Sequence, residues 1–373
     1  MEQVCKRQKR DFDDATLEDL PEEIILKILS SVNIRDLFQC MAVNKKIREI
    51  ANDQTLWNIM HLNGNDFEND FLPAELLPKI LERGCQYLSL YNCGVKAGKV
   101  KFAKNFQLKY LSLHPACDEA DDINLADLAA SCHNLEKLCV KRLDHFYPEI
   151  SQIDLKFFKC IIQNSDTLKV LDVSETQLSL ASVQRIFLLC QNLIELNISA
   201  DHCLPYNPAK LCLESVDFLC NNLTTTIEKI DISRQPNFGN DQFKTLIKRC
   251  NRITELSLSG TSVTDDSVNT IIETLSQSLV KLEPGYISFQ KNLKLASMPK
   301  MNVLILPYLS DAEEKGRLRE ILPHMKNEDF DGELRIAEPY PRIYPTRFDL
   351  DDGESLLVPN GFWDIKAKLR TYN

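Results

Sequence analysis

The stretch that decides the fold is Leu168-Lys-Val-Leu171-Asp-Val173, which is followed by a second copy, Leu193-Ile-Glu-Leu196-Asn-Ile198. Both copies place an apolar residue at positions one, four and six. The alternation at the end of each copy is typical of a short β-strand with one buried face. Residues 180–190, between the two copies, carry apolar side chains three and four positions apart, which predicts an amphipathic helix. The chain is therefore expected to alternate helices with short strands.

The same phrase recurs along most of the chain. Its nine copies begin at Cys85, Leu108, Leu135, Leu168, Leu193, Ile227, Ile253, Leu279 (a degraded copy) and Met301. Most of the spacings between copies fall within the roughly 20–29 residues of leucine-rich repeats, and two are longer. Three copies follow a cysteine, at Cys132, Cys190 and Cys250, where a small side chain suits a tight junction between helix and strand. The sequence thus predicts an α/β repeat arc with parallel strands inside and helices outside.

The side chains between the leucines are expected to point to the inner wall, because strand side chains alternate between faces. The candidate contacts for a protein substrate or accessory protein on this wall are Tyr87, Tyr91, Tyr110, His114, Lys137, Lys141, Asp172, Glu195, Lys229 and Glu255. Lysines and carboxylates on the wall nearly balance, and no arginine pair accompanies them. Since phosphate is normally gripped by arginine forks, we expect this wall to suit a mixed polar and aromatic protein surface better than a phosphopeptide.

The composition narrows the classes of function. The 373 residues are 44% hydrophobic and 26% charged, with a formal net charge of −10, so the chain is expected to be globular and not to bind nucleic acid. No apolar run approaches the roughly 20 residues of a membrane span, and no secretory signal opens the chain, so we expect an intracellular protein. The 13 cysteines include no Cys-x-x-Cys pair, which favours buried free thiols over disulfides or zinc. No metal or other cofactor is expected.

The segment before the repeats has a helical rhythm. Pro21 opens a first helix with apolar residues at helical spacing, Asn33 is placed to cap a second helix, and Ile47 lies in a third. A domain of about 45 residues buries little core on its own. Its leftover apolar surface is therefore expected to pack on another protein, or to cap the first repeat.

Several short motifs in this segment match one family. Leu20-Pro21-x-Glu23-Ile24-Ile25, Ile28-Leu29, Asp36-Leu37, Val43 and Asp53-x-x-Leu56-Trp57 resemble the F-box in residue type and spacing. The resemblance implies a three-helix module that docks on the small adaptor of SCF ubiquitin ligases, beside a cullin scaffold. The residues that it implies for adaptor binding, directly or as support, are Leu20, Pro21, Ile24, Ile28, Leu37, Val43 and Trp57. The chain departs from the family at Ile47, where a tryptophan is usual.

The end of the chain carries a further pattern. Trp363, Ile365 and Leu369 alternate with charged residues, which predicts a half-buried strand docked on the repeats, with an undocked, flexible end as the alternative. With the F-box and the repeats, this ending resembles one branch of F-box/leucine-rich-repeat proteins, that of S-phase kinase-associated protein two. The resemblance implies delivery of phosphorylated cell-cycle regulators for ubiquitination and proteasomal degradation. It also implies a small kinase-associated accessory protein that reads the phosphate, and a tail folded back over the inner wall.

The predicted organisation is a disordered tail (1–15), an F-box (16–62), linker helices (63–84), leucine-rich repeats (85–325) and a C-terminal tail (326–373). Our leading hypothesis is a non-catalytic substrate receptor of a ubiquitin ligase. A leucine-rich interaction or inhibitor protein without a ligase role is the alternative. An enzyme is the weakest reading, because no phosphate loop or hydrolase motif is present. The basic residues at 6–10 resemble a nuclear import signal, so nucleus and cytoplasm are the expected locations.

Overall fold

The computed structural model describes residues 17–64, 67, 71–73, 75–91, 93–95, 102, 107–114, 122–140, 152–176, 178–200, 210–307 and 336–337. The chain divides into two compact units, Met1–Leu135 and Glu136–Asn373. The predictions for the basic stretch 6–10, Lys141, Trp363, Ile365 and Leu369 fall outside the described residues, as do those for the tail 1–15 and for all of the C-terminal tail except Ile336 and Ala337.

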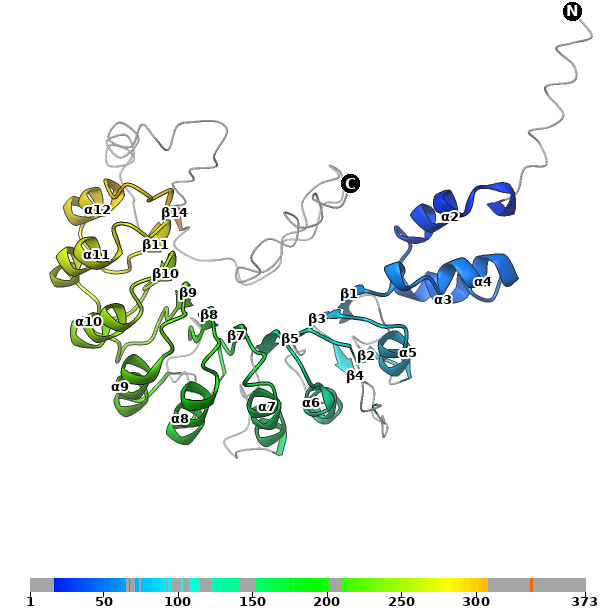
Figure 1. Ribbon diagram of the computed structural model, residues 1–373, viewed down its shortest axis with the longest axis horizontal. Helices are drawn as coiled ribbons and strands as arrows, with labels where there is room; N and C mark the ends of the chain where they lie inside the picture. Colours follow the sequence, from blue (N-terminus) through cyan, green and yellow to red (C-terminus); the bar gives the residue numbers. More distant parts are fainter. Residues whose placement is uncertain are drawn as a thin grey trace, which may run out of the picture. The chain divides into compact units, whose positions relative to one another are not determined.

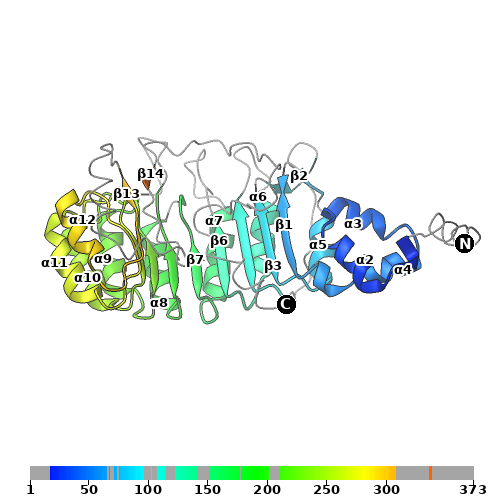
Figure 2. The same cartoon turned by 90° about the horizontal axis from the view of Figure 1, so that it is seen from above.

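Three short helices open the first unit: α2 (Glu22–Leu29), α3 (Ile34–Cys40) and α4 (Lys45–Ala51). Pro21 precedes α2, and its carbonyl oxygen accepts hydrogen bonds from the backbone of the first turn. The Asn33 side chain accepts a hydrogen bond from the Asp36 backbone N–H at 2.9 Å, so the predicted cap of α3 is confirmed. Asn44 caps α4 in the same way. Figure 2 shows the three helices grouped at one end of this unit.

The remainder of the first unit is a parallel sheet with flanking helices. Strand β1 (Ile59–Asn63) pairs with β3 (Tyr87–Tyr91), which pairs with β5 (Tyr110–His114). Helix α5 (Leu76–Glu82) leads into β3, α6 (Asp122–Ser131) follows β5, and β2 (Phe71–Leu72) pairs with β4 (Gly94–Val95). Strand β1 was not predicted, because it lies inside the helical segment and lacks the repeat phrase. The stretch predicted as linker helices, 63–84, holds β2 before its helix α5.

The second unit repeats one strand and one helix in turn. Its strands are β6 (Lys137–Val140), β7 (Val170–Asp172), β8 (Glu195–Asn197), β9 (Lys229–Asp231), β10 (Glu255–Ser257), β11 (Lys281–Glu283) and β12 (Val303–Leu304). Its helices are α7 (Gln152–Gln163), α8 (Leu180–Leu189), α9 (Leu213–Asn222), α10 (Asn240–Arg249), α11 (Val268–Leu275) and α12 (Phe289–Ala296). Neighbouring strands pair in parallel, and the helices line the outer side of this stack (Figure 1). After β12, β13 (Leu306–Pro307) pairs with β14 (Ile336–Ala337).

The repeat phrase produces this architecture directly. Its apolar positions form the core between strands and helices, so that Leu171, Leu196 and Leu256 are at most 2% exposed. The cysteines at the junctions are buried too, and the Cys250 thiol lies 3.4 Å from the Thr224 carbonyl oxygen of the preceding repeat. All nine predicted phrases contain a β-strand, so the predicted α/β repeat with parallel strands is confirmed.

One turn in the stack requires glycine. Gly285, just after β11, has a φ of +71°, which L-residues with side chains rarely adopt. A Cβ atom added there would lie 2.5 Å from the carbonyl oxygen of Leu258, so the backbone of the preceding repeat leaves no room for it. The two turns therefore approach each other closely.

Candidate protein-binding surfaces

The three N-terminal helices enclose a small core. Ile25, Leu29 and Ile47 are at most 2% exposed, and Trp57 is fully buried, with its indole N–H donating to the Ala51 carbonyl oxygen at 2.7 Å. The buried N–H is thus satisfied inside the core. This hydrogen bond ties the residue that ends the helical segment to the end of α4.

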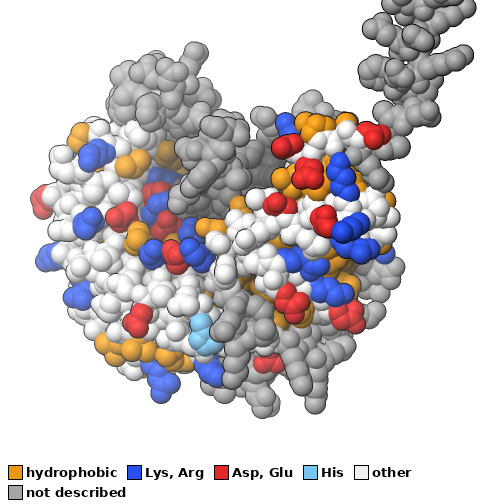
Figure 3. All heavy atoms as spheres, turned by 45° about the vertical axis from the view of Figure 1, so that its right-hand side comes forward, with side chains coloured by type: hydrophobic (Ala, Val, Ile, Leu, Met, Phe, Trp, Pro, Cys, Tyr) orange, Lys and Arg blue, Asp and Glu red, His pale blue; other side chains and the backbone are white. Residues whose placement is uncertain are grey.

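Outside this core, the helices expose a group of apolar side chains, which we call the N-terminal apolar surface: Leu17, Pro21, Ile24, Ile28 and Val43. Ile24 and Ile28 lie one turn apart on the same face of α2, where they are 46% and 39% exposed. Val43, in the turn between α3 and α4, is 68% exposed. Figure 3 shows apolar side chains gathered on this part of the molecule, at the upper right. Exposure on this scale marks a surface that another protein could cover.

The structure separates the residues that were implied for adaptor binding into two groups. Pro21, Ile24, Ile28 and Val43 are exposed, and Leu20 is half-buried, whereas Leu37 and Trp57 are at most 3% exposed. Leu37 and Trp57 therefore cannot contact a partner directly, and their part is to support the surface from the core. Leu17 was not singled out from the sequence, although it is 44% exposed beside Leu20.

Ile47, where the chain departs from the family, is enclosed in this core. Ile47 is 2% exposed, in the first turn of α4, with its backbone N–H capped by the Asn44 side chain at 2.8 Å. The branched side chain fills the position that the family usually gives to tryptophan. The three-helix arrangement is thus compatible with the smaller residue.

A second candidate surface is the strand face of the first unit. Tyr87 and Tyr91 are 36% and 38% exposed there, while Tyr110 is only 5% exposed. The rings of Tyr87 and Tyr110 lie 6.1 Å apart between centroids, a spacing that favours attraction between aromatic rings. Tyr110 was predicted as a surface contact, but it is buried beside Tyr87, its register partner on β3. His114 is the register partner of Tyr91 in β5.

The strand face of the second unit carries alternating charges, which we call the ion ladder: Glu195, Lys229, Glu255 and Lys281, on four successive strands. The Lys229 ammonium lies 3.4 Å from Glu195 and 3.0 Å from Glu255, and Lys281 lies 4.0 Å from Glu255. Burial lowers the pKa of Lys229, but the two carboxylates outweigh this and leave it raised. The lysines of the ladder are therefore engaged by carboxylates. Lys137 occupies the same register on β6 and is half-buried.

Two residues further along each strand, on the same face, lies a second polar row. Asp172, on β7, is 6% exposed and accepts a hydrogen bond from the Asn197 side chain at 3.3 Å. Asp231, on β9, accepts from the Ser233 backbone N–H at 2.9 Å, and burial raises its pKa. Ser257 donates to Glu283 at 2.7 Å. The predicted wall residue Asp172 is thus part of an internal hydrogen-bond network more than an open contact.

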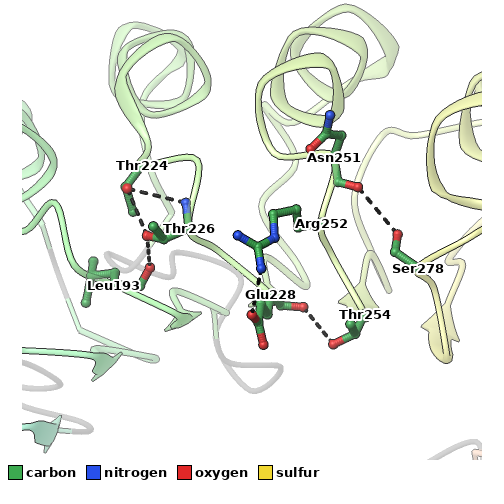
Figure 4. Close-up of polar contacts among 8 residues, drawn as sticks. All are labelled: Leu193, Thr224, Thr226, Glu228, Asn251, Arg252, Thr254 and Ser278. Carbon is green, nitrogen blue, oxygen red and sulfur yellow. Dashed lines mark hydrogen bonds and ion pairs between the residues drawn. The ribbon is translucent and has the colours of Figure 1, made fainter.

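Hydrogen bonds at the start of the strands hold both rows in register (Figure 4). The Thr226 hydroxyl donates to the Leu193 carbonyl oxygen at 2.6 Å, and the Thr254 hydroxyl donates to that of Glu228 at 3.0 Å. Each bond joins one repeat to the one before it. The side chains of the ion ladder are therefore presented by a backbone with fixed spacing.

Four of the buried cysteine thiols are expected to have low nucleophilic reactivity. Burial raises the pKa of Cys85, Cys160 and Cys190 to about 12 and that of Cys250 to about 11. A thiol is nucleophilic only as its thiolate, so these four are poor nucleophiles at neutral pH. Among the described residues, no group of three or more His, Cys, Asp or Glu side chains is arranged to hold a metal ion. No helix in the same part of the chain has the length and apolarity to cross a membrane.

Comparison with known families assigns the N-terminal helices. Residues 17–63 match the family model described as F-box-like. These residues form an F-box-like domain. Its boundaries enclose α2, α3, α4 and β1, so the exposed residues of the N-terminal apolar surface belong to this domain.

Two solved structures share a distant likeness with the chain. The crystal structure of the Rad7 and Elc1 complex in yeast has a TM-score of 0.43 and 13% identity, over 82% of this chain and 90% of that one. A leucine-rich repeat-containing protein from Legionella pneumophila, LegL7, has a TM-score of 0.38 and 10% identity, over 74% and 81%. Both scores are low, and the assignment of the fold rests on the paired strands and the repeat phrase.

Proposed function

We propose that this chain is the substrate-recognition subunit of an SCF-type ubiquitin ligase. The observation that carries the proposal is an F-box-like domain with an exposed apolar surface. In this proposal the N-terminal apolar surface binds the small adaptor, which joins the chain to the cullin scaffold. Apolar side chains exposed to this extent become buried when such a partner docks.

The repeats, in this proposal, hold the target protein. The strand face of the first unit offers tyrosines for this contact, and the strand face of the second unit offers the charged side chains of the ion ladder. The contribution of the chain is positional, since holding a target beside the charged conjugating enzyme raises the effective concentration of its lysines. No nucleophile of this chain is required, in keeping with the raised pKa of its buried thiols.

The targets that we propose are phosphorylated cell-cycle regulators, in the nucleus and cytoplasm, as the likeness of sequence to the S-phase kinase-associated protein two branch implies. Lys229 and Lys281 are already engaged by Glu195 and Glu255, so a phosphate would have to compete with these carboxylates. This engagement supports a role for the small accessory protein as the phosphate reader. The C-terminal tail would then complete the surface presented to the target.

The proposal is tested by co-purification of the full chain with adaptor and cullin. Ile24→Glu combined with Ile28→Glu places two charges on the proposed contact and is expected to lower recovery of both partners by about tenfold or more. The matched control is Leu188→Glu with Leu189→Glu, which alters two leucines of α8 that are 57% and 43% exposed. Equal recovery with both double variants contradicts the adaptor role and favours the alternative, an interaction or inhibitor protein without a ligase.

A second arm of the same experiment tests the phosphate. Target proteins recovered with the chain are compared with and without phosphatase treatment of the cell extract, and with and without added accessory protein. Loss of targets after phosphatase is the expected result. Targets that remain bound after complete dephosphorylation contradict the phosphate-dependent part of the proposal and leave the adaptor arm intact.

A further inference from the structure

Arg83 reaches from the end of α5 back onto the F-box-like domain. It directly follows α5, and its guanidinium carbon lies 4.6 Å from the centre of the Trp57 ring and 5.3 Å from that of Phe38. Both distances fall within the range of cation–π attraction. One side chain outside residues 17–63 thus covers two aromatic rings inside them.

The nitrogens of Arg83 make contacts on both sides of this junction. Nη1 donates to the Lys79 carbonyl oxygen of its own helix at 2.7 Å, and Nε donates to the Asn52 side chain at 3.3 Å. Nη2 lies 3.9 Å from the sulfur of Met41. Asn52 ends α4 and Met41 ends α3, so the guanidinium joins the end of α5 to the ends of two domain helices.

The next residue adds a steric contact at the same place. Gly84 has a φ of +86°, and a Cβ atom there would lie 2.7 Å from the side-chain nitrogen of Gln54, in the turn before Trp57. Two residues further on, the backbone N–H groups of Gln86 and Tyr87 donate to the Asn58 carbonyl oxygen at 3.0 Å. The turn after α5 therefore lies directly against the last turn of the F-box-like domain.

The ring beneath Arg83 is itself fixed. Trp57 is fully buried, and its N–H is held by the Ala51 carbonyl oxygen, so the indole cannot turn to follow a moving guanidinium. A rotation of the domain relative to α5 would separate the guanidinium from the ring and break the bond to Asn52. A lysine offers one nitrogen and no plane, so it cannot stack on the ring and reach both oxygens at once.

We propose that Arg83 is the positioning residue that fixes the orientation of the helices α2, α3 and α4 of the F-box-like domain relative to the paired strands β1 and β3. This structural part stands without any assigned function. Its consequence rests on the proposed ligase role, in which the angle between the adaptor-bound domain and the repeats determines where target lysines lie. Arg83 then acts on ubiquitin transfer with no contact to adaptor or target.

The orientation can be measured within the full chain. Spin labels are attached through a non-natural amino acid at Glu22, exposed on α2, and at Lys109, exposed before β5, so that the native cysteines play no part. Arg83→Met keeps an unbranched side chain about as long as the aliphatic part of the arginine and removes the guanidinium with its charge and donors. We expect Arg83→Met to broaden the distance distribution, Arg83→Lys to restore it partly, and Arg185→Met, at an exposed arginine on α8, to leave it unchanged.

The outcomes are separable from those of the ligase proposal. An Arg83→Met distribution as narrow as that of the wild type overturns the positioning role, whatever the chain binds. Thermal unfolding will show whether Arg83→Met is still folded. If it is not, the distances are measured in Arg83→Lys instead. A distance distribution of Arg83→Lys equal to that of the wild type then overturns the proposal. In reconstituted ubiquitination, we expect a transfer rate about tenfold lower for Arg83→Met with adaptor and target capture unchanged. Transfer at the wild-type rate with a broadened distribution overturns the functional consequence.

Discussion

The ammonium group of Lys229 lies 3.0 Å from Oε1 of Glu255, across the gap between strands β9 and β10. The two side chains are 25% and 18% exposed, so the pair is partly withdrawn from water, and Glu195 approaches the same ammonium from the other side. A cation held between two carboxylates on neighbouring strands contributes more to stability than an isolated surface ion pair. The ion ladder is therefore a structural element of the repeats as well as a candidate contact.

Replacing Lys229 should reveal how much the ion ladder contributes to stability. Lys229→Met leaves Glu195 and Glu255 facing each other, and we expect a loss of about 1–2 kcal/mol in the free energy of unfolding at pH 7, measured by urea denaturation. The control is Lys137→Met. The register partner of Lys137 is the apolar Val170, so we expect this variant to change the free energy of unfolding by less than about 0.5 kcal/mol. Equal effects of the two variants would contradict the ladder's role.

Lys229 should also make the stability of the chain depend on pH in the alkaline range. The pKa of Lys229 is raised above its usual 10.5 in the folded chain, so its contribution is complete below pH 10.5 and is lost as the pH rises through the folded value. The difference in stability between wild type and Lys229→Met should therefore stay constant near neutral pH and shrink above about pH 10.5.

Asp231 should produce a second pH dependence, in the acid range. Burial raises its pKa above 3.8, so the folded chain binds more protons than the unfolded chain in the window above pH 3.8, and stability falls as pH rises through that window. Asp231→Asn keeps an oxygen for the Ser233 N–H and cannot ionise. We expect its stability relative to wild type to increase from pH 4 to pH 7, by urea denaturation. A difference that is independent of pH would contradict the raised pKa.

The core of the F-box-like domain should reject the tryptophan that its family usually carries. Ile47 is 2% exposed, so the larger indole of Ile47→Trp is expected to push neighbouring side chains apart and to lower the free energy of unfolding by about 1–3 kcal/mol. Ile47→Val, which removes one methylene, should lower it by about 0.5–1.5 kcal/mol. A tryptophan variant more stable than wild type would mean that the core has unfilled space.

The turn at Gly285 should be intolerant of any side chain. Gly285→Ala combines a positive φ with a Cβ atom 2.5 Å from the Leu258 carbonyl oxygen, and we expect it to destabilise the chain by about 2 kcal/mol or more. Gly239→Ala is the control, because its Cβ would meet only the flexible end of Gln242 at 3.3 Å. The two variants are compared by their midpoints of urea unfolding. Similar midpoints for Gly285→Ala and Gly239→Ala would contradict the steric argument.

The thiols should differ sharply in reactivity. Cys160 and Cys190, with pKa values raised to about 12, are expected to resist iodoacetamide at pH 7.5 in the folded chain, whereas the exposed Cys212 should be alkylated. Peptide mass spectrometry over time gives the rate at each site. Alkylation of Cys160 as fast as that of Cys212 would show that its surroundings open readily.

The strands of the repeats could be predicted because their signal is local. Each Leu-x-Leu phrase specifies a buried face within three residues, and the shared period places neighbouring copies side by side. The pairing of Lys229 with Glu255 is not local, since the two residues lie in different repeats and meet only through the register of β9 and β10. The sequence analysis named both residues as wall contacts, but it could not predict that they form an ion pair with each other.

The N-terminal residues show a second limit. The spacing of Ile24 and Ile28 indicates a shared helix face, but which face turns outward depends on how α2 packs on α4. Family likeness therefore grouped the buried Trp57 with the exposed Val43. Arg83 gave no signal at all, because an arginine at the end of a helix is ordinary until Trp57 is seen beneath it.

The alternation of charge along the ladder also means that the repeats cannot be exchanged freely. If evolution or an engineer excised one whole rung, residues 227–252, strand β8 would adjoin β10, and Glu195 would stand opposite Glu255 with no cation between them. Shortening the array at that point replaces attraction with repulsion. The charges of Glu195, Lys229 and Glu255 thus constrain which repeats can be neighbours.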